Sequence, residues 1–265
     1  MIKSVLKAID ILELFSPERP IMSLSEISSA LEMNKSSAHT MLATLVSRGF
    51  IEKNGDSYHL GKTLISMTRG VLVNVDIRDR AAPYLRELAE HTKDTVYLTV
   101  PDGYYCLYIY AIESIQRLQA RSAIGDRVPY HCTSVGRALL AFMSQERVEE
   151  IISVTGMPRF TKLTITTKKE LFEELERIRK QGYGIDLGQH DDNIYCIGAP
   201  IFNERGQVIA SCSLASLHPE IVEEKLDIFS TYLLYTTQEI SKRMGYVLDK
   251  ANYQNMIENP FRKEE

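Results

Sequence analysis

Residues 23–61 read SLSEISSALEMNKSSAHTMLATLVSRGFIEKNGDSYHLG, and this stretch carries the start and stop signals of several short elements. Ser23 and Glu26 have the spacing of a capping box, which begins a short helix. Asn34 can cap a further helix, and Gly49 supplies the left-handed residue that ends it. Alternating apolar residues then flank the turn sequence NGD, which is typical of a β-hairpin. The stretch therefore predicts helix, turn, helix and hairpin in that order.

An amphipathic helix precedes this stretch and ends before Ser16-Pro17. Its apolar residues with helical spacing are Val5, Ala8, Ile9, Leu12 and Phe15. Three helices followed by a hairpin are the order of a winged helix-turn-helix, whose third helix fits a major groove about 12 Å wide. We therefore expect residues 1–61 to form a DNA-binding domain.

The third predicted helix carries short or planar hydrogen-bonding side chains on its outer side, which suit contact with base edges. Basic residues at its two ends and on the hairpin suit contact with phosphates. The residues that we predict to bind DNA are Lys35, Ser36, Ser37, His39, Thr40, Thr44, Arg48 and Lys53. An alternative stays open, in which the helical head binds another protein and these side chains are only solvated.

The composition is that of an ordinary folded protein. Of the 265 residues, 44% are hydrophobic and 25% are charged, which excludes collagen-like and wholly disordered chains. No apolar run reaches the ~18 to 20 residues that span a bilayer. Asp10 and Glu13 interrupt the amino-terminal stretch where a secretory signal would be apolar. We therefore expect a cytoplasmic protein that does not contact the membrane.

Charge and cysteine usage narrow the function classes further. The formal net charge is −4, but residues 1–70 hold eight Lys and Arg against seven Asp and Glu, so nucleic-acid contact is expected at the amino end. The four cysteines are Cys106, Cys132, Cys196 and Cys212, and none stands in C-x-x-C spacing. This pattern disfavours a zinc knuckle, a thioredoxin-type redox pair and a disulfide scaffold.

A helical connector is predicted at residues 62–82, and a domain of mixed helices and strands follows at residues 83–265. Strands are predicted at 95–100, 104–112, 118–122, 195–202 and 208–214, and helices at 136–143, 146–154, 168–181 and 219–244. Because strands follow one another in adjacent pairs along the chain, this order indicates an α+β domain with an antiparallel sheet.

Chemically reactive patterns are weak in this second domain. His131-Cys132 suggests a thiol hydrolase, but neighbouring residues on a strand point to opposite faces and cannot pair. His190-Asp191-Asp192 suggests a metal cluster, although a loop histidine beside carboxylates is usually solvated. Phosphate-binding glycine motifs do not occur in the sequence. We predict no catalytic residue, no metal ligand and no cofactor, and hence no enzyme.

A series of short motifs runs along nearly the whole chain. In the first domain these motifs occupy residues 4–15, 24–27, 34–39, 42–45 and 58–61. In the second domain they are GDRVPYH at 125–131, GRALLA at 136–141, TIT at 164–166, GYGID at 182–186 and CIGAP at 196–200. In order and spacing this series resembles the IclR family of transcriptional regulators.

The resemblance implies a winged helix-turn-helix that a linker helix joins to a GAF-like effector domain, assembled as a homodimer or a dimer of dimers. It implies a repressor of a catabolic operon, which binds double-stranded DNA at a palindromic operator and senses a small metabolite such as a carboxylate. The effector contacts of the family correspond in this sequence to Ser134, Val135, Asp186, Cys196, Ser213 and Ala215.

The sequence departs from the family pattern near the implied effector site. After Ser213 it lacks a second hydroxyl at the next position, and Asn193 replaces a usual glycine. The sequence LGQH follows Asp186, where acidic residues are common in the family. Fewer acids beside the site would favour a more negative or more polar effector. One or two of the strand tyrosines are expected to line the same pocket: Tyr97, Tyr104, Tyr105, Tyr108 and Tyr110.

Overall fold

Side-chain caps begin two of the amino-terminal helices. The Ser23 hydroxyl accepts a hydrogen bond from the Glu26 amide at 3.3 Å, and the Glu26 carboxylate accepts one from the Ser23 amide at 2.7 Å. The Asn34 side chain accepts one from the Ser37 amide at 2.9 Å, and Gly49 has φ = 72° after the helix that follows. The predicted capping box, the Asn34 cap and the left-handed glycine are thus confirmed.

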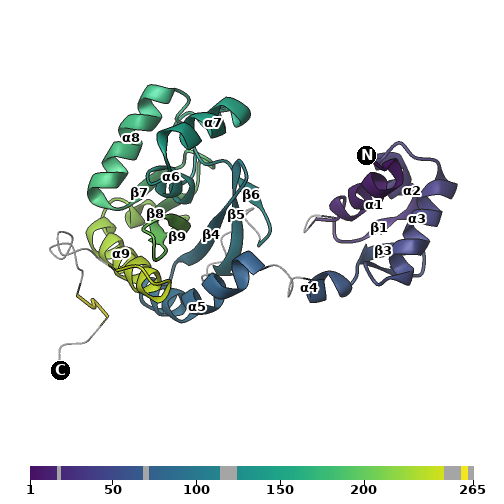
Figure 1. The fold of residues 1–265 in the computed structure, drawn as a ribbon, viewed down its shortest axis with the longest axis horizontal. Coiled ribbons are helices and arrows are strands. Elements are labelled where there is room, and N and C mark those ends of the chain that lie inside the picture. The colour runs from purple at the N-terminus through teal and green to yellow at the C-terminus, as the bar shows by residue number, and fades with distance from the viewer. Residues whose placement is uncertain (17–18, 68–71, 114–123, 248–257, 262–265) are drawn as a thin grey trace. The chain divides into compact units, whose positions relative to one another are not determined.

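A computed structural model describes residues 1–16, 19–67, 72–113, 124–247 and 258–261 (Figure 1). The chain divides into two units, Met1–Leu72 and Val73–Glu265. The first unit contains α1 (Lys3–Glu13), β1 (Met22–Ser23), α2 (Leu24–Ala30), α3 (Lys35–Ser47), β2 (Ile51–Asn54), β3 (Ser57–Leu60) and α4 (Thr63–Met67). Its strands pair in the order β1-β3-β2. The predicted winged helix-turn-helix is therefore confirmed.

Two details of this unit differ from the sequence prediction. Ile11 and Phe15 are buried in its core, whereas Val5 is 53% and Ile9 is 45% exposed. The core covers only one side of α1, so part of the predicted apolar stripe lies at the surface. Strand β1 was not predicted, because two residues are too short to show an alternating pattern.

The helix α5 (Leu72–Thr92) runs without a break through residue 82, where the sequence predicted the connector to end, and Pro83 lies in its interior. Its side chains that are buried in the core of the second unit are Ile77, Ala81, Leu85 and Leu88. Because these residues have helical spacing on both sides of residue 82, the same apolar face continues across the predicted boundary.

The second unit is an antiparallel sheet with helices on both faces (Figure 1). Its described strands are β4 (Thr95–Asp102), β5 (Tyr105–Ile112), β6 (Arg127–Val128), β7 (Gly184–Leu187), β8 (Tyr195–Phe202) and β9 (Val208–Ser216), paired in the order β6-β5-β4-β9-β8-β7. Its other described helices are α6 (Ser134–Leu140), α7 (Gln145–Thr155), α8 (Lys168–Gln181), the 3-10 turn η2 (Pro219–Ile221) and α9 (Leu226–Arg243). The α+β class is confirmed.

Side chains along the central strand β4 point alternately to the two faces of the sheet, and both faces are buried. Val96, Leu98 and Val100 pack in one core with α5 and α9, whereas Tyr97 packs in the other with α6, α7 and α8. Figure 1 shows these two sets of helices on opposite sides of the sheet. Among the described residues, helices that combine the length and the apolar surface of a membrane span are absent.

Several sequence predictions for this unit need correction. Strands β6 and β7 were missed because each is short. The helix predicted at 219–244 is two elements, η2 and α9, because Pro219 opens a separate 3-10 turn. His131 and Cys132 lie in a turn before α6, so the argument that strand neighbours face apart does not apply to them. The predicted strand 118–122 lies outside the described residues.

Gly198 on β8 lets the start of α6 lie close to the sheet. A Cβ atom at this position would stand 2.7 Å from the Ser134 carbonyl carbon and 2.8 Å from its oxygen, which is too close for real atoms. Both contacts are with backbone atoms, which no side-chain rotation can move away. The buried Ser211 hydroxyl also donates to the Val135 carbonyl at 3.1 Å. These contacts fix the first turn of α6 against the strands.

Replacing Gly198 with alanine should lower the free energy of unfolding by about 1–3 kcal/mol, the usual cost of overpacking a buried site. Chemical denaturation of the full-length protein measures this change. Gly206→Asn is the matched control, because Gly206 has φ = 71° and its nearest neighbour would lie at 3.8 Å. Asparagine tolerates that backbone, so the control should change stability by less than about 0.5 kcal/mol. An unchanged stability of Gly198→Ala would contradict the close packing of α6 on β8.

Candidate functional site

A small cavity of about 40 Å³ lies between the sheet and the first turn of α6. Its lining residues are Tyr97, Tyr108, Thr133, Ser134, Val135, Asp186, His190, Asp191, Ile194, Cys196, Ser213 and Ala215. All six residues predicted to contact an effector stand on this wall, together with two of the strand tyrosines. The structure therefore brings into one place residues that lie far apart in the sequence.

The strand register explains why these side chains meet. Asp186 on β7 is opposite Cys196 on β8, which is opposite Ala215 on β9. Ser213, which lies two residues before Ala215 on β9, is opposite Tyr97 on β4. Because side chains alternate between the two faces of a strand, these five residues share the face towards α6.

The other wall residues were not among the predicted effector contacts. Thr133 caps α6 by accepting a hydrogen bond from the Gly136 amide at 3.1 Å, and a threonine before a helix is a signal that sequence analysis could have used. His190, Asp191 and Ile194 belong to the loop between β7 and β8. The sequence singled out His190 and Asp191 only as a possible metal cluster, and no local pattern indicates that this loop folds back over the cavity, so their place on the wall could not be predicted.

Asp186 is the buried acid of the cavity, with only 4% of its surface exposed. Burial raises the pKa of its carboxyl to about 6, although the Arg137 charge and two backbone amides act in the opposite direction. Those amides, from Gln189 and Gly188, donate to one carboxylate oxygen at 2.7 Å and 3.1 Å. Asp186 therefore changes its charge in the mildly acidic range.

The neighbouring groups leave the cavity acidic. Burial raises the pKa of the Cys196 thiol, raises that of Tyr97 to about 12, and lowers that of His190. Among the described residues, no lysine or arginine lines the wall, and Asp191 adds a second acid beside Asp186. The wall thus carries two acids, while the LGQH run after Asp186 contributes only His190 to it. No three potential metal ligands come together in the described part of the chain.

Arg137 lies fully buried behind this wall. Its guanidinium donates to the carbonyl oxygens of His131 at 3.1 Å and Ile185 at 2.6 Å. Glu174 on α8 lies 4.0 Å from the same guanidinium and pairs with Arg177 at 3.0 Å. The hydrogen bond to Ile185, the residue before the cavity acid, ties Arg137 to β7, and the Arg137 charge stabilises the ionised Asp186 carboxylate.

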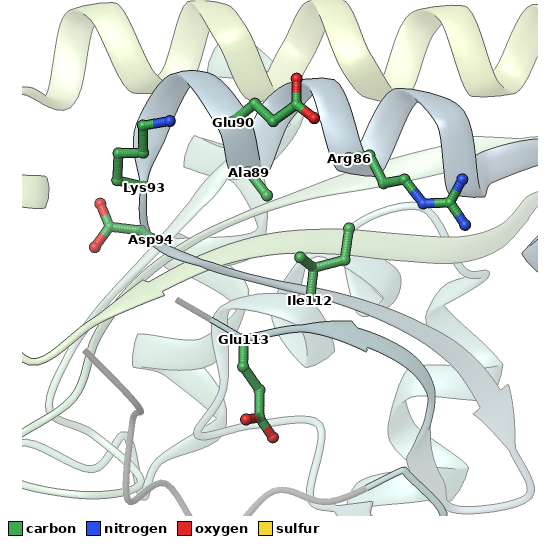
Figure 2. Close-up of a pocket in the computed structure, with 7 residues that line it drawn as sticks. All are labelled: Arg86, Ala89, Glu90, Lys93, Asp94, Ile112 and Glu113. Atoms are coloured by element: carbon green, nitrogen blue, oxygen red, sulfur yellow. The ribbon is translucent and has the colours of Figure 1, made fainter. Parts of the chain in front are cut away.

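A second hollow, of about 220 Å³, lies beside the carboxyl end of α5 (Figure 2). Arg86, Glu90 and Lys93 stand around it, and Ala89 and Ile112 lie between them (Figure 2). Exposed groups of both signs are screened by water and select no single class of ligand. The cavity beneath α6 is therefore the better candidate for a ligand site.

The predicted DNA-binding residues of the first unit lie along α3 and on the hairpin. Lys35 begins α3, and Arg48 follows its last turn. The exposed members of the set are Lys35, Ser36, His39, Thr40, Thr44, Arg48 and Lys53, whereas Ser37 is half-buried. Lys53 on β2 also stands 5.6 Å from the centre of the Tyr58 ring. The helix and hairpin thus present one set of polar and basic side chains at the surface.

Three hydroxyl groups on α3 already donate within the helix. Ser36 donates to the Asn34 side chain at 3.2 Å, Thr40 to the Ser36 carbonyl at 3.0 Å, and Thr44 to the Thr40 carbonyl at 3.0 Å. With the hydrogen engaged, each oxygen retains acceptor capacity for a base amino group. His39 adds an exposed imidazole among them. Thr44 also borders an apolar hollow between α1 and α3.

Two family models match the chain: the IclR helix-turn-helix domain over residues 4–55 and the bacterial transcriptional regulator IclR C-terminal over residues 69–242. The HTH-type transcriptional regulator KdgR of Escherichia coli K12 is 34% identical over 247 residues, covering 92% of this chain and 94% of the relative. XynR, an HTH-type transcriptional regulator of the same organism, is 31% identical over 248 residues, covering 93% and 98%. The crystal structure of Thermotoga maritima IclR has a TM-score of 0.80 and 32% identity, covering 93% of this chain and 100% of that one. The two curated relatives are named as regulators, not as enzymes.

The pKa of Asp186 makes a prediction about stability. The folded value of about 6 lies above the ordinary value of 3.8, so between these pH values the folded protein retains a proton that the unfolded chain has lost. Stability from this group therefore falls as the pH rises from 4 to 6, by about 3 kcal/mol. Because asparagine does not titrate, Asp186→Asn should gain about this amount relative to the wild type between pH 4 and pH 7.

Chemical denaturation of both proteins over this pH range measures the difference in unfolding free energy. The matched control is Asn193→Ala in the same loop, because this side chain is exposed and does not titrate, so its difference from the wild type should stay flat. A flat difference for Asp186→Asn would show that burial does not raise the pKa of this carboxyl.

Proposed function

Because the chain belongs to the IclR family of transcriptional regulators, we propose that it represses a catabolic operon and that a small carboxylate effector sets its affinity for operator DNA. Residues 1–61 bind DNA, residues 62–82 connect, and residues 83–265 bind the effector and assemble the oligomer. The observation that supports an effector site is the cavity whose wall holds all six predicted contacts, Asp186 among them. Repression requires only that the protein occupy its operator.

The recognition helix of this proposal is α3. Ser36, Ser37, His39, Thr40 and Thr44 face base edges in the major groove, and Lys35, Arg48 and Lys53 contact phosphates. A two-fold homodimer, alone or within a dimer of dimers, places two such helices on half-sites ~34–36 Å apart or at a multiple of that distance. The operator is therefore palindromic.

The cavity suits a small carboxylate even though no lysine or arginine stands on its wall among the described residues. Ser134 and Ser213 bring hydroxyl groups that can donate to a carboxylate oxygen. Asp186 can donate a hydrogen bond when it is neutral, whereas its ionised form would repel an anion. Since its pKa is about 6, that proton is available in the mildly acidic range. Binding of a carboxylate should therefore be coupled to protonation of Asp186.

The effector can change DNA affinity only if it binds the DNA-competent and DNA-incompetent forms with different affinities. For a repressor of a catabolic operon, the effector favours the incompetent form and releases the operator. By linkage, operator DNA then weakens effector binding by the same factor. This reciprocity can be measured by calorimetry with and without DNA.

Selection of binding sites from a random duplex pool with the full-length protein tests whether the protein binds a specific DNA sequence. We expect a palindromic site whose affinity, followed by fluorescence anisotropy, falls steeply with salt. If folded, oligomeric protein enriches no site with or without a metabolite extract, the alternative in which the head binds protein is favoured. Calorimetry against aliphatic, aromatic and sugar carboxylates and their amides tests whether the effector is a carboxylate. Binding of the amides alone would contradict a carboxylate effector.

His39→Ala should cost about 1–3 kcal/mol of binding free energy on the selected site and little on random DNA, because a base contact discriminates by that amount. Anisotropy titrations on the two duplexes measure this difference. Equal losses on the selected and random duplexes would mean that His39 contacts the DNA backbone or supports folding, and that it does not read a base.

Lys35→Ala and Arg48→Ala should each weaken binding to selected and random DNA alike. Each should also reduce the slope of log affinity against log salt by about one unit, because one phosphate contact is lost. Lys169→Ala is the matched control, since this lysine is 86% exposed on α8 of the second unit. An unchanged slope would remove the residue from the set of phosphate contacts.

Affinity for the carboxylate effector should fall by up to about tenfold per pH unit above pH 6, because binding takes up the proton of Asp186. Calorimetry in two buffers with different ionisation enthalpies counts that proton. Asp186→Asn should bind without proton uptake and without this pH dependence. Wild-type binding that takes up no proton would contradict the role of Asp186.

A further inference from the structure

The segment Asn259–Phe261 lies against α5 and α9 of the second unit. The centre of the Phe261 ring is 4.4 Å from that of His91 on α5. It is 4.9 Å from the Tyr232 ring and 5.5 Å from the Tyr235 ring, both on α9. These separations and their tilted or edge-on geometry are those of attractive aromatic pairs. Phe261 is half-buried and packs on the edge of the core beneath the two helices.

Local interactions prepare both partners for this contact. The Asn259 side chain accepts a hydrogen bond from the Phe261 amide at 2.9 Å, which closes a small turn. Pro260 inside that turn has a fixed φ, so little further backbone freedom is lost on docking. On the helix side, the His91 Nδ1 lies 2.8 Å from the Glu87 carbonyl oxygen, which orients the imidazole. The ring of Phe261 thus meets side chains that are already positioned.

The two helices that carry this aromatic site are antiparallel neighbours (Figure 1). Near the other end of the pair, Arg80 donates to the Arg243 carbonyl at 2.7 Å, and Arg243 donates to the Tyr84 hydroxyl at 2.8 Å. His91 and Tyr232 mark the opposite end, with ring centres 6.2 Å apart. Hydrogen bonds therefore join α5 to α9 at one end, and the aromatic contacts with Phe261 lie at the other.

The docked segment also lies beyond the part of the chain that the family pattern covers. The carboxyl-terminal family model ends at residue 242, within the last turn of α9. Asn259–Phe261 follows it and is therefore a feature of this chain beyond that pattern. It contributes no residue to the wall of the cavity.

We propose that the side chains of His91, Tyr232 and Tyr235 form a docking site for the chain's own carboxyl-terminal segment, and that Phe261 anchors this segment there. The docked ring fastens the carboxyl end of α5 to α9. Removal of the ring exposes the aromatic site and lets the last turn of α5 open more often, because local opening is governed by the contacts that hold each element.

The absence of tryptophan from the sequence allows a direct test of docking. Phe261→Trp places a single indole at the proposed anchor in the full-length protein. We expect blue-shifted emission and low iodide quenching, because a docked indole is shielded from water. Adding His91→Ala and Tyr235→Ala to this variant should shift the emission to the red and raise the quenching. Emission and quenching equal to those of free tryptophan amide in the first variant would overturn the proposal.

Hydrogen exchange gives a second readout that needs no new fluorophore. Phe261→Ala should speed the exchange of the Leu88–Thr92 amides by about tenfold and leave α3 and α8 unchanged. Tyr246→Ala is the matched control, because this ring also follows α9 but contacts Phe202 at 5.3 Å instead of the proposed site. Exchange at the end of α5 that is equal in Phe261→Ala and the wild type would overturn the anchoring role.

Discussion

The first turn of α6 can lie on the sheet only because residue 198 of β8 has no side chain. A Cβ atom there would fall within 3 Å of the Ser134 backbone, so any other residue would push the helix away. Ser134 and Val135 form one wall of the cavity, and the opposite wall is a row of strand side chains set by register. The position of this wall therefore depends on the close approach of α6 to Gly198. The Ser211 hydrogen bond to Val135 holds the same turn from a second direction.

Buried charge is the second constraint on this site. A carboxyl group as buried as Asp186 loses hydration, and two amide donors together with Arg137 compensate only in part. Arg137 is itself buried, and its partners are two backbone carbonyls and the carboxylate of Glu174. An apolar side chain at residue 186 would avoid this cost, so the acid is easier to explain by what it does for a ligand than by stability.

Much of the first unit could be predicted because its signals are local. A capping box, an asparagine cap and a left-handed glycine each act within a few residues, and all three appear in the structure. The sequence could not show which side of α1 faces the core. The helix carries more apolar residues than the small core buries, so Val5 and Ile9 stay exposed. In the second unit the family resemblance pointed to strand residues of the cavity, whereas His190 and Asp191 reach it through a loop whose path no local pattern encodes. The continuous helix α5 shows the same limit, since packing against the sheet carries it past Pro83.

If the cavity beneath α6 controls DNA affinity, as we propose, then filling the cavity should uncouple the effector from the operator. Ala215 is 2% exposed, lines the cavity and belongs to the second unit, so Ala215→Leu should occupy the space without changing any residue of the first unit. Operator affinity of this variant should be measured by anisotropy with and without the carboxylate found by calorimetry. We predict wild-type affinity without effector and no release of DNA when the effector is added. A filled-cavity variant that still releases its operator would show that the effector acts at another site.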